Sequence, residues 1–436
     1  MGVIFDPNSY GDFESLLGKE SKKFKKTCGP KWLLMDIVLQ FENINYNIRV
    51  RCIIADAPAR SFVKNIKSHN GYFGCERCYR RGKWFRNRVT YPVKAKAEAY
   101  TDASFRERWY ESHHKGLSPL ENIKLNMIVQ IPLDYMHMVC LGVVKKMLSA
   151  WVEGPLTSKL GPKQIQIVSD RLEEFKSYIP SNFSRKCRGL NELAHFKATE
   201  FRTFVLYVGP FALRKILNKD KFDHFLCLHV AIYILVSEAQ NEEWVTFAGE
   251  LIEKFVSEIP KLYHKELIVY NFHSILHLHD EARIYGCLDN FSAFEFESYM
   301  QKIKRLLRSH SSHLSQVVRR IEETVNSNYD DPAAISKYIR GKGFSSSGRD
   351  NCYRTTDKKY CIIKSISPFV VQYLEVIDIS WYPIKSSKLG IYKVIKYGDI
   401  VEVLPQILCR KCIFLRTPNE VTGYVVPLCN SDLTSN

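Results

Sequence analysis

The stretch that decides the fold covers residues 55–78 and reads ADAPARSFVKNIKSHNGYFGCERC. It begins where an apolar run ends at Asp56, and it closes on the C-x-x-C pair Cys75 and Cys78. An acid at a strand end is typical of a site for a hard cation, whereas a pair of thiols is typical of a zinc site. The rest of the chain must therefore supply further ligands for both.

The segments on either side of Asp56 predict different structures. Residues 31–41 and 45–56 are rich in β-branched and apolar side chains and predict two adjacent strands joined by the polar turn ENIN. The second strand ends at Asp56 because a proline follows and residues 61–69 then take up a helical pattern. Residues 79–120 are polar, basic and aromatic with little periodicity, which predicts a loop with short elements.

A second acid follows a second apolar run. Residues 124–132 predict a short strand closed by Pro132. Asp134 then begins an amphipathic helix whose apolar residues recur at helical spacing up to Trp151. From about 160 to 285 every strong segment predicts a helix, so a helical block separates the strand-rich regions.

The end of the chain changes character twice. Residues 294–308 and 314–328 predict two more helices. Residues 341–351 are rich in Gly and Ser and predict a linker. Beyond the linker, alternating segments predict a small β-rich C-terminal domain over 350–436.

The charge of the chain suggests a polyanionic partner. The 436 residues include 63 Lys and Arg against 46 Asp and Glu, a net charge of +17, and a hydrophobic content of 45% indicates a globular core. The excess is clustered at 19–26, 77–88 and 302–308, and the middle cluster interleaves Trp84 and Phe85 with basic residues, as suits phosphates and stacked bases. The alternative is that the charge only makes the protein soluble.

The cysteines and the N-terminus indicate a reducing compartment. Thirteen cysteines are scattered along a long chain, and their odd number resembles no small disulfide framework. The first residues lack a basic region followed by an apolar core, so no secretory signal is expected. The longest apolar stretches are too short or too interrupted to span a bilayer. The cytosol or the nucleus is expected, and a DNA partner favours the nucleus.

Five segments, in order along the chain, resemble a known family. They read CIIADAPAR with GYFGCERC, IPLDYMHMVCLGVVKKML, FKATEFRTFVLYVGP, VYNFHSILHLHDEARIYG and FSAFEFESYMQKIKRLLR. They look like the successive blocks of DDE transposases of the CACTA/Mirage/Chapaev superfamily, and more closely of the animal proteins called transposase domain-containing. The resemblance covers residues 30 to 430, nearly the whole chain.

This resemblance implies an α/β fold with an RNase H-like core interrupted by a large all-helical insertion. The implied segments are 1–140 for the first part of the core with its C-x-x-C knuckle, 141–285 for the insertion, 286–340 for the closing helices of the core, and 350–436 for the β-rich C-terminal domain. The implied activity is phosphodiester hydrolysis and strand transfer at transposon ends, which belongs to DNA recombination.

The resemblance also assigns roles to acids. Asp56 becomes the first, Asp134 the second and Glu297 the third ligand of two Mg²⁺ (or Mn²⁺) ions. Glu295 is a rival for the third place, because the segment FEFE offers two glutamates. His137 resembles the histidine of the family's DxxH segment and is expected to support catalysis; the alternative is a histidine bonded within the helix packing.

The thiol pair needs two more ligands of nitrogen or sulfur type. His273 and His277 are four residues apart on one helical face, which suits a single metal, and the family resemblance pairs a C-x-x-C with histidines ahead of the last glutamate. We therefore expect Cys75, Cys78, His273 and His277 to bind a structural Zn²⁺. Substitute ligands are His69 and His279, and the alternative is a cluster without metal.

Double-stranded DNA, at transposon ends and target, is the expected partner of a homo-oligomer without membrane contact. The candidate DNA-binding residues are Arg77, Arg80, Arg81, Lys83, Arg86, Arg88, Lys302, Lys304 and Arg305. No helix-turn-helix or zinc-finger module is recognisable before residue 30, which favours a transposase-derived protein that binds DNA or assembles without catalysis. A third alternative is an RNase H-like nuclease that acts on RNA or a hybrid.

Overall fold

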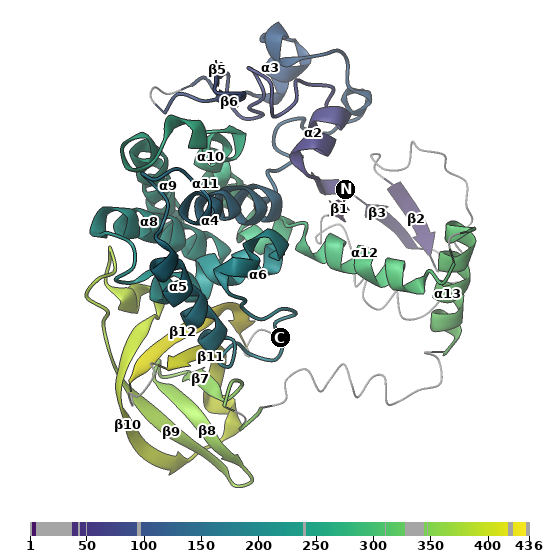
Figure 1. Ribbon diagram of the computed structural model, residues 1–436. Coiled ribbons are helices and arrows are strands. Elements are labelled where there is room, and N and C mark those ends of the chain that lie inside the picture. Colours follow the sequence, from purple (N-terminus) through teal and green to yellow (C-terminus); the bar gives the residue numbers. More distant parts are fainter. Residues whose placement is uncertain are drawn as a thin grey trace. The chain divides into compact units, whose positions relative to one another are not determined.

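The computed structural model describes most of the chain (Figure 1). The described residues are 2–5, 37–41, 44–48, 50–93, 97–238, 241–309, 311–327, 344–346, 348–416 and 422–432. The basic cluster at 19–26 lies outside the described residues, as do residues 341–343 and 347 of the linker expected at 341–351; the described residues of that linker form no helix or strand.

The chain forms two compact units. Residues 1–147 and 240–293 form the first unit, and residues 148–239 and 294–436 form the second. Each unit is therefore built from two separate stretches of sequence, and the helical block expected over 141–285 is shared between them. Mixed helix and strand is the fold class, with the strands of the second unit gathered at its C-terminal end.

The strands of the first unit come in antiparallel pairs. β2 (Ile37–Phe41) pairs with β3 (Ile44–Ile48), and β1 (Gly2–Phe5) pairs with β4 (Val50–Ile54), where Gly2 lies opposite Ile54. The single strand predicted over 45–56 is therefore two strands with different partners. A helix does follow Asp56, but it is α2 (Ala57–Val63), which begins four residues before the segment predicted over 61–69 and ends within it, because Asp56 caps the helix directly.

The loop after α2 contains the short elements that its composition predicts. They are the hairpin strands β5 (Lys83–Phe85) and β6 (Arg88–Thr90) and the helix α3 (Asp102–Arg106). A small apolar core, with Ile53, Ile66, Phe105, Met127 and Ile131 among its buried members, holds this loop against β4.

The strand predicted over 124–132 is wrong, because the side chain of Asn126 closes a turn. Its Oδ1 accepts hydrogen bonds from the backbone N–H groups of Ile128 (3.0 Å) and Val129 (2.8 Å), and its carbonyl accepts from Gln130 N–H (3.1 Å). Asparagine offers the backbone this local alternative to a strand ladder.

The helix predicted after Asp134 is confirmed. It begins as a π-helix (Met136–Val144) and continues as α4 (Lys145–Val152). A side chain in place of the Gly142 hydrogen would place Cβ 2.5 Å from Nδ2 of Asn271, so only glycine permits this close approach to α10 (Tyr270–Ser274). The first unit is completed by α9 (Glu242–Leu262) and α11 (Leu278–Tyr285).

The second unit combines helices with a closed barrel (Figure 1). Its helices are α5 (Pro162–Phe175), α6 (Ala198–Thr203), α7 (Gly209–Leu213), α8 (Lys219–Val236), α12 (Phe294–Leu306) and α13 (His313–Ser327). The expected helical segments are thereby confirmed. Within the described part of the chain, no helix combines the length and apolar character that crossing a bilayer requires.

The β-rich C-terminal domain is confirmed, and it is a six-stranded barrel. The strands are β7 (Cys352–Thr355), β8 (Tyr360–Ile366), β9 (Phe369–Ile377), β10 (Tyr392–Glu402), β11 (Leu408–Arg416) and β12 (Gly423–Asp432). They close in the order β10-β12-β11-β7-β8-β9, which leaves no free strand edge. Tyr233 of α8 donates to the carbonyl of Pro427 (2.8 Å) and so ties the barrel to the helices of its own unit.

Candidate metal centre and acidic residues

Two cysteines and two histidines of the first unit converge. The ligand atoms of Cys75, Cys78, His273 and His277 all lie within 4.8 Å of one another. Cys75 Sγ is 3.6 Å from Cys78 Sγ and 3.6 Å from His277 Nε2, and Cys78 Sγ is 3.3 Å from His273 Nε2. A tetrahedron with Zn–S bonds of about 2.3 Å has S–S edges of about 3.8 Å. The spacing therefore fits one tetrahedral ion, and this cluster could hold a metal such as zinc.

Local structure explains why these side chains meet. Gly74 precedes the first cysteine, and a Cβ there would lie 2.5 Å from the carbonyl oxygen of Ser68, so the loop can close only with glycine. His273 belongs to α10, and His277 ends the following 3₁₀ turn, Ile275–His277, one helical turn later. The two imidazole rings therefore lie on one face of this helical segment, with their centroids 5.4 Å apart.

The thiol pair is prepared to lose a proton. Burial raises the pKa of Cys75, but a hydrogen bond from Cys78 and the charges of His273 and His277 outweigh it and hold the pKa of Cys75 well below its ordinary value. The hydrogen bond to Cys75, and then burial, raise the pKa of the Cys78 thiol. Cys75 therefore loses its proton readily and accepts the hydrogen bond of the Cys78 thiol, and a bound metal ion would displace this remaining proton.

The substitute ligands lie outside the cluster. His69 packs edge-on against Tyr270 with ring centroids 5.8 Å apart, and its Nδ1 is 3.4 Å from Ser68 Oγ. His279 Nε2 is 3.4 Å from Asp280 Oδ1. The geometry selects His273 and His277.

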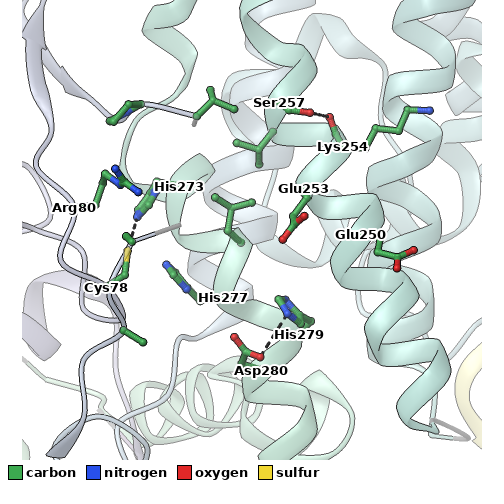
Figure 2. A pocket seen from close by; sticks show the side chains of 16 residues that line it. Cys78, Arg80, Glu250, Glu253, Lys254, Ser257, His273, His277, His279 and Asp280 are labelled. Carbon is green, nitrogen blue, oxygen red and sulfur yellow. Dashed lines mark hydrogen bonds and ion pairs between the residues drawn. The ribbon is translucent and has the colours of Figure 1, made fainter. Parts of the chain in front are cut away.

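A cavity of about 740 Å³ borders the cluster within the first unit. Figure 2 shows Cys78, His273 and His277 on one side and Glu250 and Glu253 of α9 on the other. His277 is only partly buried, whereas the other three ligands are buried. An ion can therefore reach the cluster from this cavity.

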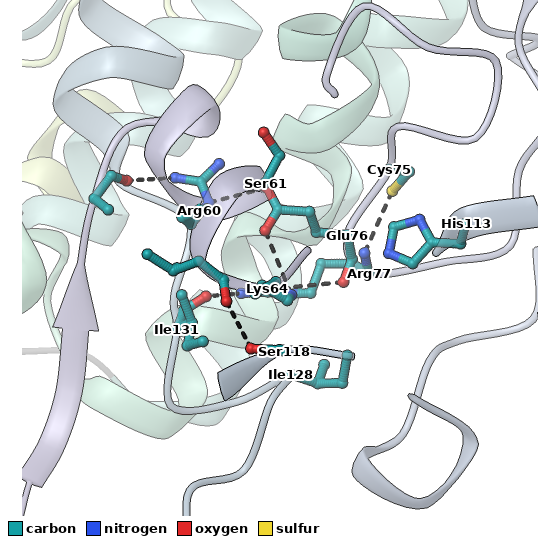
Figure 3. A network of polar contacts seen from close by, with 12 residues as sticks. Arg60, Ser61, Lys64, Cys75, Glu76, Arg77, His113, Ser118, Ile128 and Ile131 are labelled. Atoms are coloured by element: carbon teal, nitrogen blue, oxygen red, sulfur yellow. Dashed lines mark hydrogen bonds and ion pairs between the residues drawn. The ribbon is translucent and has the colours of Figure 1, made fainter. Parts of the chain in front are cut away.

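The two residues between the cysteines carry a buried ion network (Figure 3). Glu76 accepts hydrogen bonds from Arg60 Nε (2.9 Å) and from the Tyr270 hydroxyl (2.7 Å), and its other oxygen is 3.4 Å from Lys64 Nζ. Burial raises the pKa of Glu76, but the charges of Arg60, Lys64 and Arg77 outweigh burial and lower it to about 2. Glu76 is therefore ionised in the interior of the unit.

Arg77 is an interior residue. Its side chain is 9% exposed, its Nε donates to Glu281 Oε1 at 2.6 Å, and its Nη2 donates to the carbonyl of Ile131 at 2.8 Å. These contacts hold α11 and the segment that precedes Asp134. We therefore correct its assignment to DNA binding, because its charge is neutralised inside the unit.

Asp56 begins α2. Its Oδ1 accepts the backbone N–H of Ala59 at 2.8 Å, and the side chain is only partly buried. The carbonyl of the preceding Ala55 accepts a 2.6 Å hydrogen bond from Arg60 Nη1. The ion network thus reaches the backbone next to the first acid.

Asp134 is completely buried, and both of its oxygens have partners. Oδ1 accepts from Ala293 N–H (2.8 Å), and Oδ2 accepts from the backbone N–H of His137 (3.0 Å) and lies 2.6 Å from its Nδ1. The side chain of His137 is 30% exposed, and its contact with Asp134 fits both a histidine that orients the acid and one bonded within the helix packing. The second acid therefore caps its helix and anchors the chain at Ala293.

The structure does not gather the three acids within one unit. Asp56 and Asp134 belong to the first unit, whereas Glu295 and Glu297 are exposed residues of α12 in the second. The strand that leads to Asp56 contacts the segment ahead of Asp134, because Ile53 N–H donates to the Gln130 carbonyl at 2.8 Å. Within the described residues, the Cys/His cluster is the one group of three or more side chains with metal-ligand spacing.

Most candidate DNA-binding residues are exposed. On the β5–β6 hairpin and just before it, the exposed basic residues are Arg81, Lys83, Arg86 and Arg88, while Arg80 is half-buried. Arg86 Nη1 lies 2.6 Å from Glu266 Oε1. Lys304 and Arg305 are exposed on α12, and the side chain of Lys302 is outside the described residues.

The ion network was not predicted. Arg60 and Glu76 lie in the stretch 55–78 and Glu281 lies in α11, and the apolar pattern of neither segment singles out these charged side chains. One signal was present, because Glu76 and Arg77 stand between two cysteines that must be buried to bind zinc. Their charges therefore needed buried partners.

Comparisons with protein-family models, with curated proteins and with solved structures find no match to this chain.

Proposed function

We propose that the chain is the catalytic domain of a DDE-type DNA transposase with an RNase H-like core, in which Asp56, Asp134 and Glu297 act together. The observation that carries the proposal is the hydrogen bond from Ala293 N–H to Asp134 Oδ1. Ala293 directly precedes α12 in the sequence, and Glu297 follows it by four residues.

The contact between Ile53 and Gln130 supports the place of the first acid. Asp56 follows Ile53 by three residues, and Asp134 follows Gln130 by four. Each acid therefore lies only a few residues beyond this backbone contact. Arg60 and Arg77 brace these two stretches at Ala55 and Ile131. A polynucleotidyl transferase needs such fixed carboxylates, because positioning supplies much of its rate.

The chemistry assigns the chain's residues to distinct tasks. When bound, two Mg²⁺ ions activate the attacking hydroxyl and stabilise the leaving oxygen of the phosphodiester. Asp56, Asp134 and Glu297 would hold the ions. His137 Nδ1 lies 2.6 Å from Asp134 Oδ2, so this contact must open for that carboxylate oxygen to become available. Exposed arginines and lysines neutralise the DNA backbone.

Asp56→Asn gives the sharpest test. Asparagine caps a helix as well as aspartate does, so the bond to Ala59 N–H survives while the metal-binding charge is lost. We expect Mg²⁺-dependent nicking of plasmid DNA by the purified chain, and a fall of at least about 100-fold in Asp56→Asn and in Glu297→Gln. Glu295→Gln is the matched control on α12 and keeps activity. Equal nicking by parent and Asp56→Asn would refute the assignment.

The burial of Asp134 favours a second candidate, a transposase-derived protein that binds DNA without cutting it. A carboxylate that is fully buried and occupied by N–H groups serves structure well without any cation. Under this alternative, DNA binding persists in Asp134→Asn, and neither the parent nor the variant nicks DNA in Mg²⁺ or Mn²⁺.

A further inference from the structure

The β5–β6 hairpin is a rigid projection of the metal-binding loop. Its two-residue turn places Arg86 at φ 43° and Asn87 at φ 64°, the left-handed conformation at both positions that a type I′ turn requires. Phe85 lies opposite Arg88, and Trp84 opposite Val89. Trp84 therefore shares one face of the hairpin with Val89, and Phe85 shares the other face with Arg88. Val89 is buried while Trp84 is 60% exposed, so the hairpin is anchored through Val89 and its aromatic rings remain accessible.

The exposed side chains of this hairpin combine two kinds of contact. The side chains of Trp84 and Phe85 are 60% and 42% exposed, although large aromatic side chains are usually buried. Arg81, Lys83 and Arg88 are exposed beside them. Aromatic faces between cations match a single nucleic-acid strand, whose bases stack on rings while its phosphates meet the positive charges.

The metal cluster supports this hairpin directly. Tyr91, the residue after β6, stacks on the ligand His273 with ring centroids 4.7 Å apart and an interplanar angle of 11°. Its N–H donates to the Ile268 carbonyl (2.8 Å), and its hydroxyl donates to the Gly71 carbonyl (3.2 Å). Gly82 N–H donates to the Tyr72 carbonyl (2.6 Å). Both ends of the hairpin are thus fastened to the loop that the metal would hold.

We propose that the hairpin, residues 81–90, binds unpaired DNA nucleotides, with bases stacked on Trp84 and Phe85, and that a metal at the Cys/His cluster keeps it in the binding position. Bases within a duplex already stack on each other and offer no free face, so the unpaired strand is the preferred form. The inference deepens the proposed function by naming the form of DNA, and a binding assay without cleavage tests it separately.

The experiment measures anisotropy of a labelled 20-nucleotide oligo-dT and of a duplex of equal length, without Mg²⁺, on the zinc-loaded full chain. We expect tighter binding of the single strand. Trp84→Ala and Phe85→Ala each weaken it by about 10-fold, and Trp84→Phe restores most of the loss because phenylalanine still stacks. Trp109→Ala is the matched control and leaves binding unchanged, since Trp109 is equally exposed (61%) but its indole N–H bonds to Glu107.

Charge and metal give two further readouts. Lys83→Gln and Arg88→Gln each reduce the slope of log affinity against log salt by about 0.7, the value for one phosphate of a single strand. Chelation of the metal, or Cys78→Ser, weakens oligo-dT binding as strongly as Trp84→Ala does.

Three outcomes would overturn the proposal: equal affinity for duplex and single strand, equal or tighter binding of oligo-U RNA, or full binding by Trp84→Ala with its metal retained. Nicking assays on Asp56→Asn are independent of these results. Failure of the hairpin proposal and failure of the proposed function are therefore distinguishable.

Discussion

The four residues of the C-E-R-C stretch make two different sets of buried contacts. The outer pair, Cys75 and Cys78, faces His273 and His277, and the inner pair, Glu76 and Arg77, enters the ion network. Both sets of contacts need burial, because thiolate–metal bonds and ion pairs both strengthen when water is excluded. Four consecutive residues thus fix one loop through two independent sets of contacts.

The metal ligands make the first prediction. Chain purified without chelators is expected to carry about one zinc, and Cys78→Ser and His273→Gln to carry almost none, because a tetrahedral site with three ligands binds far more weakly. His279→Gln, which changes a neighbouring histidine outside the cluster, keeps its zinc. Elemental analysis per mole of chain checks this, and retention of zinc by Cys78→Ser would exclude the site.

Glu76→Gln tests the ion network. Loss of the carboxylate leaves the buried cations Arg60 and Lys64 without their partner, and we expect about 3–5 kcal/mol of destabilisation in urea unfolding at pH 7. The pKa of Glu76 is lowered from 4.5 to about 2, so its stabilisation is complete above pH 4.5 and is lost as pH falls toward 2. Glu111→Gln, an exposed change on the same loop, is the control, and an equal effect in both variants would contradict a specific role.

At the scale of elements, polar groups decide how buried helices pack. α8 is buried along nearly its whole length, and its His229 has both ring nitrogens engaged. Nδ1 lies 2.7 Å from the Val205 carbonyl and must donate, so Nε2 accepts from the Tyr382 hydroxyl at 3.1 Å. The imidazole is therefore neutral where it joins α8 to the segment that precedes β10.

The neutral His229 predicts acid sensitivity of the second unit. Burial lowers its pKa from 6.5 to about 4, and the bond to the Val205 carbonyl only partly opposes this. Stabilisation is complete above pH 6.5 and is lost as pH falls to about 4, because the unfolded chain binds the proton first; the loss amounts to about 3 kcal/mol.

His229→Asn should remove this dependence. The amide nitrogen takes the place of Nδ1 and keeps the bond to Val205, but it does not titrate. Hydrogen exchange of α8 amides between pH 7 and pH 4.5, corrected for the intrinsic rate, checks it. His195→Asn, an exposed change in the same unit, should follow the parent protein, and an unchanged slope in His229→Asn would contradict the assignment.

At the scale of the whole molecule, the metal cluster belongs to one unit only. Its ligands join residues 75–78 to residues 273–277, which are distant in sequence but share the first unit. The barrel of the second unit is closed by its own strand pairing. Segments distant in sequence are therefore brought together by the Cys/His cluster in the first unit and by pairing between strands in the second.

Removal of the metal is expected to destabilise part of the first unit and to leave the barrel of the second unit unchanged. After chelation, amide exchange rises about tenfold or more in residues 71–91 and 268–278, because the metal no longer closes that loop. Exchange in the barrel, residues 352–432, stays unchanged and serves as the internal control. Equal loosening of both units would show that the cluster does not act locally.

Much of this organisation can be read from the chain. Apolar periodicity predicted the helices after Asp134 and the β-rich end. Residue spacing, together with the family resemblance, predicted that Cys75, Cys78, His273 and His277 come together. The turn at Asn126 was missed because a short apolar run reads as a strand unless the side chain's own hydrogen bonds are counted. Closure of the barrel was missed because strand order is a property of pairing and not of pattern.

The sequence by itself determined which residue types are available: soft ligands at metal spacing, acids after apolar runs, and aromatic residues among cations. Only the tertiary structure decided that Arg77 lies in the interior, that Asp134 is buried against Ala293, and that Tyr91 joins the hairpin to His273. The physical reason is that periodicity reports the local environment of each segment. Ion pairs, stacking and metal coordination depend on which distant segments meet, and that is settled when the whole core packs.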